Sequence, residues 1–387
     1  MPSSAVSTVR VKSAGVADPS QVPAKLRVTE LDLLRFCAAF AVMLYHYTYK
    51  PTLPNGPPGP FPILGRLTMH GYLGVSLFFM ISGFVILWTA REKTPSGFVI
   101  SRISRLYPEF WIGVALSSLT FATLGPSTRS IGLGTMLANL TMVPHFLGYP
   151  YVDDVYWTLF VELKFYFLLW ALSVTGQMSR IESWLYAWLG VTVLCFVFDM
   201  PAAVRSMALY PYGPLFIGGC SFFLIRARGS TAARWIAVPV CLVLAVQATT
   251  NMMPAFVHRE DVTRDALNEA TGLIVLFFVL FAAVALRRGM HVKFAKTIVF
   301  LGMLTYPLYL LHNIGKVTLL AWIAPSSPII ALSVTVAFSL GLSALVVRAV
   351  EPWRKRLVKQ LASAYATTRA RLPAAAYSVK SHDSRTQ

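Results

Sequence analysis

The segment LLRFCAAFAVMLYHYTY, residues 33–49, is hydrophobic enough to span a membrane, yet it contains an arginine and a histidine. Arg35 and His46 are eleven residues apart. At 100° per residue both side chains lie on one face of a helix, about 16 Å apart along its axis. Arg35 is either an interfacial anchor or an anion-binding group, and His46 is either a satisfied polar residue or a proton-transfer group. Their common face favours a functional site, because ionisable residues in a span usually face a bundle interior or a water-filled cavity.

Two other ionisable residues are expected at a depth similar to that of His46. Glu162, in YWTLFVELKFYFLLW, is about 9 Å from the outer end of its span at helical rise. Thr158 and Tyr166, four residues to either side, share its helix face. His312, in LTYPLYLLHNIG, also falls in the outer half of a span. We therefore expect His46, Glu162 and His312 to lie at one depth, and the sequence does not show whether their helices adjoin.

A cationic cluster is expected on the opposite side of the membrane. Arg102 and Arg105, in FVISRISRLYPEFW, are three residues apart and therefore on one side of a helix. Together with Arg35 they predict a phosphate site, because guanidinium groups present forked donors to phosphate oxygens. The alternative is that these are ordinary basic residues flanking a span. Asp32 is within i+3 reach of Arg35.

The composition indicates which elements must position these residues. Of 387 residues, 56% are hydrophobic and only 13% are charged, whereas soluble proteins average about 25% charged residues. We therefore predict an all-α polytopic membrane protein. The hydrophobic segments predict ten transmembrane helices of roughly spanning length: 31–49, 71–90, 108–124, 156–175, 184–199, 209–225, 235–250, 268–286, 298–323 and 329–350.

The net charge of +18 is explained by membrane topology. With the N-terminus in the cytoplasm, 24 of the 34 Lys and Arg residues fall in cytoplasmic segments, six in outer loops and four within spans. Both termini are then cytoplasmic, and no nucleic-acid partner is needed. We divide the chain into a basic arm (1–28), a transmembrane domain (29–352) and a basic tail expected to be disordered (353–387). We expect a multi-pass protein of the cell (inner or plasma) membrane.

The cysteines are expected to be structural. All four lie in hydrophobic segments without metal-ligand spacing, which favours packed thiols without a disulfide and gives no reason to expect a metal. The sequence names no partner for Lys164, which lies within the same span as Glu162.

Five motifs, in order, resemble those of the acyltransferase-3 family of integral membrane acyltransferases. The resemblance covers most of residues 28–352. The motifs are the Arg35–His46 pair, GVSLFFMISGF (74–84), RISRLYPEFW (102–111), WTLFVELKFY (157–166) and TYPLYLLH (305–312).

The resemblance implies transfer of an acyl group, commonly acetyl, from cytoplasmic acyl-CoA to an acceptor. The acceptor is usually a sugar of an exported glycan, although some members act on antibiotics or other small molecules. It implies that His46 lies near the acyl-transfer centre, that Arg35 helps hold the donor, and that Arg102 and Arg105 bind the CoA phosphates. The chain departs from the family where a second carboxylate and then Gln are common: these positions are Leu163 and Lys164.

The residue pattern and the resemblance together suggest a path for the donor. The pantetheine arm is expected to run along the small residues between Arg35 and His46, namely Ala38, Ala39 and Val42. The thioester then reaches His46, which takes the proton of an acceptor hydroxyl, while Glu162 fixes the imidazole tautomer or binds the acceptor. Ser82 either donates to an oxyanion or packs closely against a neighbouring helix. The expected partners are acyl-CoA, a glycan or lipid-linked sugar acceptor and membrane lipid.

Two other functional classes remain open. Intramembrane His, Glu and Arg residues can form the proton relay of a transporter. The absence of an inverted repeat in the sequence argues against that reading. The chain can also be a non-catalytic glycan-binding or export partner. Acceptor-dependent release of free CoA distinguishes the enzyme from both.

Overall fold

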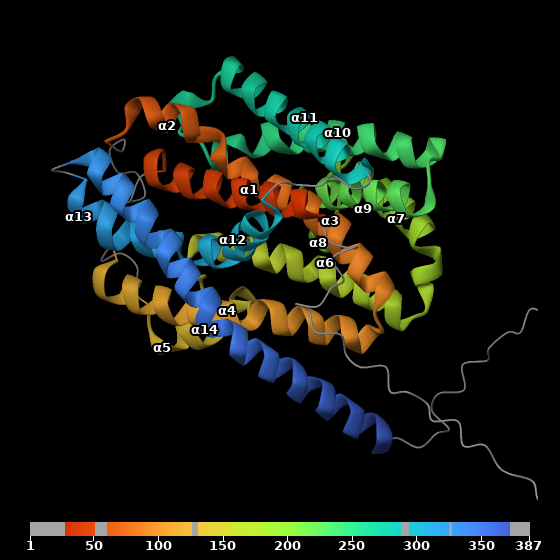
Figure 1. Ribbon diagram of the computed structural model, residues 1–387. Helices are drawn as coiled ribbons and strands as arrows, with labels where there is room; N and C mark the ends of the chain where they lie inside the picture. The colour runs from red at the N-terminus through yellow and green to blue at the C-terminus, as the bar shows by residue number, and fades with distance from the viewer. Residues whose placement is uncertain (1–27, 51–59, 126–130, 288–293, 325–326, 372–387) are drawn as a thin grey trace, which may run out of the picture.

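The computed structural model describes residues 28–50, 60–125, 131–287, 294–324 and 327–371, and within these ranges it contains helices and no strand (Figure 1). The principal helices are α1 (Thr29–Thr48), α3 (Gly74–Glu92), α4 (Pro95–Leu124), α6 (Trp157–Val174), α7 (Ile181–Val197), α9 (Gly213–Arg228), α10 (Ala232–Met252), α11 (Arg264–Leu286), α12 (Ala295–Gly315) and α14 (Pro328–Arg371). The shorter helices are α2 (Pro62–Thr68), α5 (Leu133–Asn139), α8 (Ala202–Met207) and α13 (Ala321–Ile323), with single-turn segments η2 (Met69–Leu73), η3 (Pro144–Leu147), η4 (Asp154–Tyr156), η5 (Gln177–Arg180), η6 (Met253–Ala255), η7 (Arg259–Asp261) and a π-helical η8 (Lys316–Leu320).

Each of the ten expected spans coincides with one of the principal helices. By length and composition, seven helical segments in the described ranges can cross a membrane. The segments built on α1, α4 and α9 are not among them, because α1 and α4 carry ionisable residues and α9 has only 16 residues. The polytopic helical architecture is therefore confirmed, while the number of ten spans and the position of the termini remain predictions.

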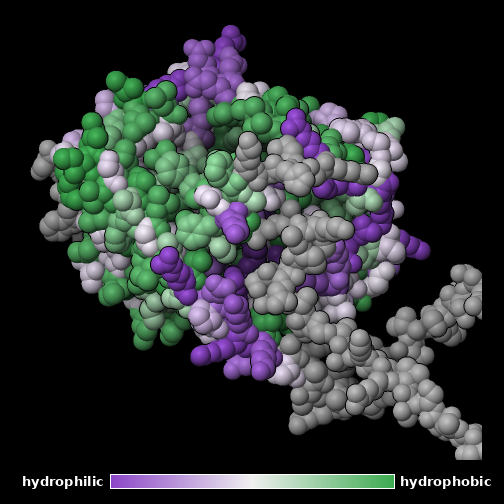
Figure 2. Space-filling view, in the orientation of Figure 1, coloured by the Kyte–Doolittle hydropathy of each residue, from purple (hydrophilic) through white to green (hydrophobic). Residues whose placement is uncertain are grey.

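The outer surface is suited to lipid. Large hydrophobic side chains are exposed on many helices, and Figure 2 shows them covering much of one face, with hydrophilic residues gathered toward part of it. Soluble monomers rarely expose contiguous apolar patches of this kind. Examples are Leu119, Phe167, Val243, Val279 and Leu345.

Helices α1 and α12 pack against each other in the middle of the bundle, with α10 and α11 on one side and α4 and α14 on the other (Figure 1). Helix α3 packs against both α1 and α9. At its crossing with α9, Gly83 lies against the backbone of Phe216 and Gly219 lies against that of Met80, too close for a Cβ atom. Such small-residue contacts let membrane helices approach closely.

The small-residue face of α1 is occupied by protein. Gly74 lies against the carbonyl oxygen of Ala38 and the side chain of Val42, and Gly71 lies against the backbone of Ala41. Ala38 and Ala39 are 3% and 1% exposed. The expected pantetheine path along this face is therefore wrong, because the glycines of η2 and α3 bring another backbone into the space.

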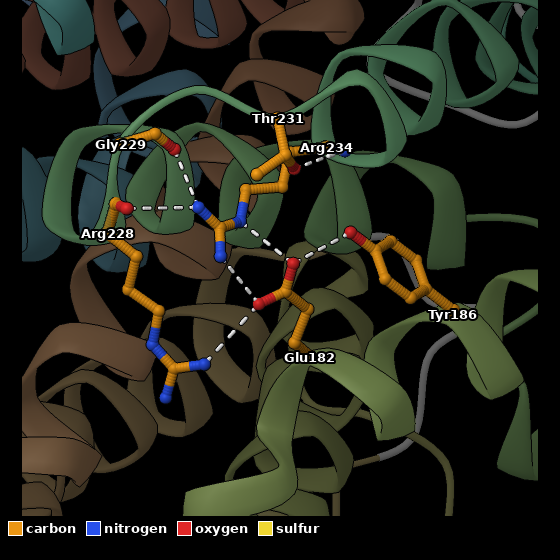
Figure 3. A network of polar contacts seen from close by, with 6 residues as sticks. All are labelled: Glu182, Tyr186, Arg228, Gly229, Thr231 and Arg234. Atoms are coloured by element: carbon orange, nitrogen blue, oxygen red, sulfur yellow. Dashed lines mark hydrogen bonds and ion pairs between the residues drawn. The ribbon is translucent and has the colours of Figure 1, made fainter.

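Helices α7, α9 and α10 are joined at one end by an ionic network (Figure 3). Arg234 donates from Nε and Nη2 to the two carboxylate oxygens of Glu182, both at 2.8 Å, and from Nη1 to the carbonyl oxygen of Gly229 at 2.7 Å. Tyr186 donates to the same carboxylate at 3.0 Å, and Arg228 approaches it at 3.4 Å. This bidentate geometry fixes the α9–α10 turn against the start of α7.

Helix α14 extends well past the expected end of the transmembrane domain. It includes Pro352 and continues to Arg371, so the domain boundary at residue 353 falls inside a helix. The expectation of a disordered tail is wrong for residues 353–371, because this segment is rich in Lys, Arg, Leu, Gln and Ala, which favour helix. Residues 372–387 and 1–27 lie outside the described residues.

Candidate active site

The bundle contains two cavities whose lining residues come from opposite helix ends. The larger, about 540 Å³, is lined by the start of α1, the end of α3 and the start of α4, together with α6, α12 and α14. It includes Arg35, Arg102 and Arg105, and we call it the arginine chamber. The smaller, about 170 Å³, is lined by the end of α1, the start of α3 and the end of α10. It includes His46, and we call it the histidine chamber.

The three predicted arginines therefore share one cavity. Arg35 approaches Asp32 at 3.8 Å, as the i+3 spacing indicated. The guanidinium of Arg102 lies 5.8 Å from the ring centroids of both Phe98 and Tyr166, and it donates to the hydroxyl of Ser101 at 3.2 Å. Within the described part of the chain its buried Nε has no hydrogen-bond partner. An unpaired buried donor on a cation suits an anionic ligand.

Other charged residues complete the arginine chamber. The sequence reasoning missed Lys93 and Arg354, which also line it. By sequence Arg354 belongs to the basic tail. It reaches the arginine chamber because α14 packs against α4. Four carboxylates share the cavity: Asp32, Glu92, Glu162 and Glu351. The cavity therefore has five cations and four carboxylates in its lining, and Arg35 and Asp32 form an ion pair.

Glu162 lies in the arginine chamber, away from the histidine chamber. Its Oε1 accepts a hydrogen bond from Ser82 at 2.6 Å, so that hydroxyl is committed to the carboxylate. Glu162 and His46 therefore line different cavities, because depth along a helix does not specify the direction in which a side chain points. Lys164 turns elsewhere, with its amine 5.1 Å from the ring centroid of Phe160 and 3.4 Å from the carbonyl oxygen of Ser206.

The two histidines meet in the structure. Nε2 of His312 is 3.2 Å from Nδ1 of His46, and their ring centroids are 4.9 Å apart. Both side chains are buried, His46 at 8% and His312 at 1% exposure. Tyr47 fixes the local backbone by donating to the carbonyl oxygen of His312 at 2.6 Å and pairing with Ser339 on α14 at 2.7 Å.

The neighbouring carbonyl groups determine which histidine nitrogen is basic. Nδ1 of His312 faces the carbonyl oxygens of Leu308 and Tyr309 at 3.1 and 2.9 Å, so it carries the proton and Nε2 is an acceptor. Nδ1 of His46 then donates to that Nε2 and to the carbonyl oxygen of Val42 at 2.8 Å. In this tautomer Nε2 of His46 holds the lone pair, which gives the histidine chamber a base.

The two chambers meet at a seam formed by Val75 and Tyr309, which line both. The Tyr309 hydroxyl pairs with Thr158 at 2.8 Å and donates to the carbonyl oxygen of Val155 at 3.0 Å. Its ring lies between Phe78 and His312, at 5.9 and 6.1 Å from their ring centroids. A ligand extending from the arginines to the histidines must pass Tyr309, a role that the motif TYPLYLLH alone did not indicate.

The described residues contain no group of three or more His, Cys, Asp or Glu side chains arranged to hold a metal ion. All four cysteines are free thiols, and none of them lines either chamber. Cys195, Cys220 and Cys241 are packed as expected, whereas Cys37 is exposed. The imidazole of His46 lines the aromatic cavity, and the cationic cavity lies on the other side of the seam.

Comparison with known proteins agrees with this geometry. An acyltransferase MdmB from Streptomyces mycarofaciens is 27% identical over 260 residues, which cover 60% of this chain and 66% of that protein, just under two thirds of its length. No solved structure was found to match. The family model described as "Acyltransferase domain" matches residues 28–348, from the start of α1 into α14. The match spans most of the chain, and the protein therefore belongs to the acyltransferase-3 family of membrane acyltransferases.

Proposed function

We propose that this protein is a membrane-embedded O-acyltransferase that moves an acyl group, commonly acetyl, from cytoplasmic acyl-CoA to an acceptor hydroxyl. The observation that carries this proposal is the meeting of a cationic chamber and a histidine chamber at one seam, beside a base of defined tautomer. Membership of an acyltransferase family supports it independently.

The arginine chamber is the donor site in this proposal. CoA carries a diphosphate and a 3′-phosphate, and forked guanidinium donors match phosphate oxygens. We assign these phosphates to Arg102, Arg105 and Arg354. Arg35, in an early turn of α1, lines the same chamber. The pantetheine arm crosses the seam at Tyr309, which replaces the path along α1 that the sequence suggested. In this proposal the chamber opens to the cytoplasm, and the basic residues at its helix ends support that orientation.

The reaction takes place beside His46. The acceptor oxygen attacks the thioester carbonyl carbon while Nε2 of His46 removes the hydroxyl proton. The C–S bond breaks, the CoA thiolate leaves, and the imidazolium returns its proton to sulfur. His312 is a positioning residue, because it accepts the hydrogen bond from Nδ1 of His46. Glu162 acts in the donor chamber, where it orders Ser82 and balances the arginines.

The acceptor in this proposal is a hydroxyl of a sugar in an exported glycan, reached from the extracytoplasmic side of the cell membrane. A second acceptor class is a small molecule, such as an antibiotic or a lipid-linked sugar. The small size and aromatic lining of the histidine chamber favour either a single sugar ring or a compact molecule of this second class.

A transporter is the competing function, because two cavities at opposite ends of a bundle also suit alternating access. The purified protein in lipid nanodiscs is incubated with radiolabelled acetyl-CoA and a panel of methyl pyranosides, and free CoA is measured with a thiol reagent. The proposal expects CoA release that requires an acceptor, labelled ester product, and loss of both with His46→Ala. Saturable binding of CoA without any ester product, together with uptake of unmodified glycoside into proteoliposomes, would identify a transporter.

A further inference from the structure

We infer that the histidine chamber receives one isolated hydroxylated ring with an apolar face, and that the Tyr72 hydroxyl recognises it. This inference rests on the proposed function and adds the form in which the acceptor enters. The acylated ring is then the terminal ring of its molecule, and Tyr72 is a specificity residue for it.

The size of the chamber sets the size of the group that enters. Its volume is about 170 Å³, and a protein cavity of about 150 Å³ is large enough for benzene. One six-membered ring therefore fits, whereas a second linked ring has to remain outside. Lys50 and Asp154, both exposed, lie at the end of the chamber and give it a polar mouth for the rest of the molecule.

The walls favour an apolar ring face. Tyr72 stacks on Phe256 with ring centroids 4.8 Å apart and an interplanar angle of 4°. The ring centroid of Trp157 lies 5.2 Å from that of Tyr212 and 6.4 Å from that of Phe256. Trp157, Tyr212 and Phe256 are only partly buried and line the chamber. The electron-rich faces of aromatic rings attract the slightly positive C–H groups of a saturated ring.

The Tyr72 hydroxyl is a buried polar group in this wall. Tyr72 is 6% exposed, and within the described ranges its hydroxyl has no hydrogen-bond partner. Two other wall tyrosines have hydrogen bonds: Tyr45 donates to the carbonyl oxygen of Phe256, and the Tyr309 hydroxyl pairs with Thr158 and donates to the carbonyl oxygen of Val155. Leaving a buried hydroxyl unpaired is unfavourable, so its retention in a cavity wall points to a ligand polar group.

The remaining polar groups lie where a polyhydroxylated ring needs them. Ser76 and Thr249 are buried in the lining, and Nε2 of His46 supplies the acceptor for one hydroxyl proton. A few placed polar groups in a mainly apolar pocket are typical of sites that fix the orientation of a small ligand. A pyranose combines an apolar C–H face with hydroxyls at its edge, and it can belong to a glycan end or to a glycosylated small molecule.

Saturation-transfer NMR on the full chain in nanodiscs tests the inference without requiring turnover. The probes are methyl α-glucopyranoside, methyl α-galactopyranoside and methyl α-rhamnopyranoside, with sorbitol as an acyclic control. We expect saturation of ring C–H protons for at least one glycoside and none for sorbitol. Tyr72→Phe should weaken binding of that glycoside about 2- to 13-fold, the loss of affinity expected for one neutral hydrogen bond. The thermal stability of this variant should be unchanged or higher. Tyr186→Phe, which alters a tyrosine outside the chamber (Figure 3), should have no effect on binding.

Two further measurements distinguish a glycan end from a small molecule as the source of the ring. Maltotetraose should compete if the ring is a glycan end, and 4-nitrophenyl glycosides should bind more tightly if a small-molecule aglycone occupies the mouth. Equal saturation of sorbitol, no saturation with any probe, or unchanged affinity in Tyr72→Phe would overturn the inference. Glycoside binding without acyl transfer would instead refute the proposed function, while the binding site would still be supported.

Discussion

Replacing the two histidines separately tests which one is the base and how its tautomer is fixed. His46→Ala removes the proposed base. His312→Phe keeps the ring volume and removes the acceptor for Nδ1 of His46, together with the donor to the carbonyl oxygens of Leu308 and Tyr309. If His46 is the base, the two variants should differ in the size of the turnover loss, with CoA affinity unchanged in both.

The expected magnitudes follow from the contacts of each residue. General base catalysis contributes about 10²–10⁴-fold, so His46→Ala should lose at least about 10²-fold. In His312→Phe, Nδ1 of His46 still donates to the carbonyl oxygen of Val42 at 2.8 Å, so the tautomer is retained. Loss of one neutral hydrogen bond costs about 0.5–1.5 kcal/mol, or roughly 2- to 13-fold in rate.

The assay is turnover per folded molecule, with labelled acetyl-CoA and the best glycoside acceptor. His46→Gln is the matched variant, because it preserves volume and some hydrogen bonding but provides no usable base. Near-parent turnover in His46→Gln would refute the role of His46. A loss in His312→Phe that equals or exceeds that of His46→Ala would transfer the role of base to His312.

Three other predictions follow from the arrangement of the helices. Arg102→Ala should weaken CoA binding by about 1.5–3 kcal/mol, the value of a hydrogen bond to a charged group. Arg354→Ala should weaken it less, because this side chain is partly exposed, and Arg356→Ala, exposed on the same helix, should not. Calorimetric titration measures the CoA affinity of each variant. Equal affinities in all three variants would show that these arginines set membrane topology and do not bind CoA. Arg234→Lys should lower the melting temperature because lysine cannot reproduce the bidentate contact with Glu182 (Figure 3), and an unchanged melting curve would show that the network adds no stability. Reporter fusions test the ten-span topology, and consistently inverted signals would reverse the donor side. The fusions expected to be external follow residues 58, 127 and 258, and those expected to be internal follow residues 95, 230 and 290.

Residue spacing predicted those site features that belong to a single helix. The i+3 relation of Asp32 and Arg35 appears as an ion pair, and the ten hydrophobic segments appear as ten helices. These properties follow from helical periodicity, which depends on neighbours within a few residues.

Features that join two helices were only partly predicted. The sequence indicated one depth for His46, Glu162 and His312, but only the structure shows that the two histidines meet and that Glu162 lines the other chamber. Depth is fixed by the distance from a helix end, but the direction of a side chain depends on how each helix rotates against its neighbours. Crossings such as Gly83 with Phe216 set that rotation, and they involve residues far apart in the chain.

The sequence by itself determined the helices, their hydrophobic character, the family and the ionisable residues available for chemistry, because each of these depends on local composition or short motifs. Only the tertiary structure decided that the small face of α1 is filled by Gly71 and Gly74, and that Tyr309 stands between two chambers. It also decided that Arg354 lines the arginine chamber and that, within the described residues, the buried Tyr72 hydroxyl has no hydrogen-bond partner. These properties depend on which surfaces of distant helices come into contact, and local sequence does not encode that choice.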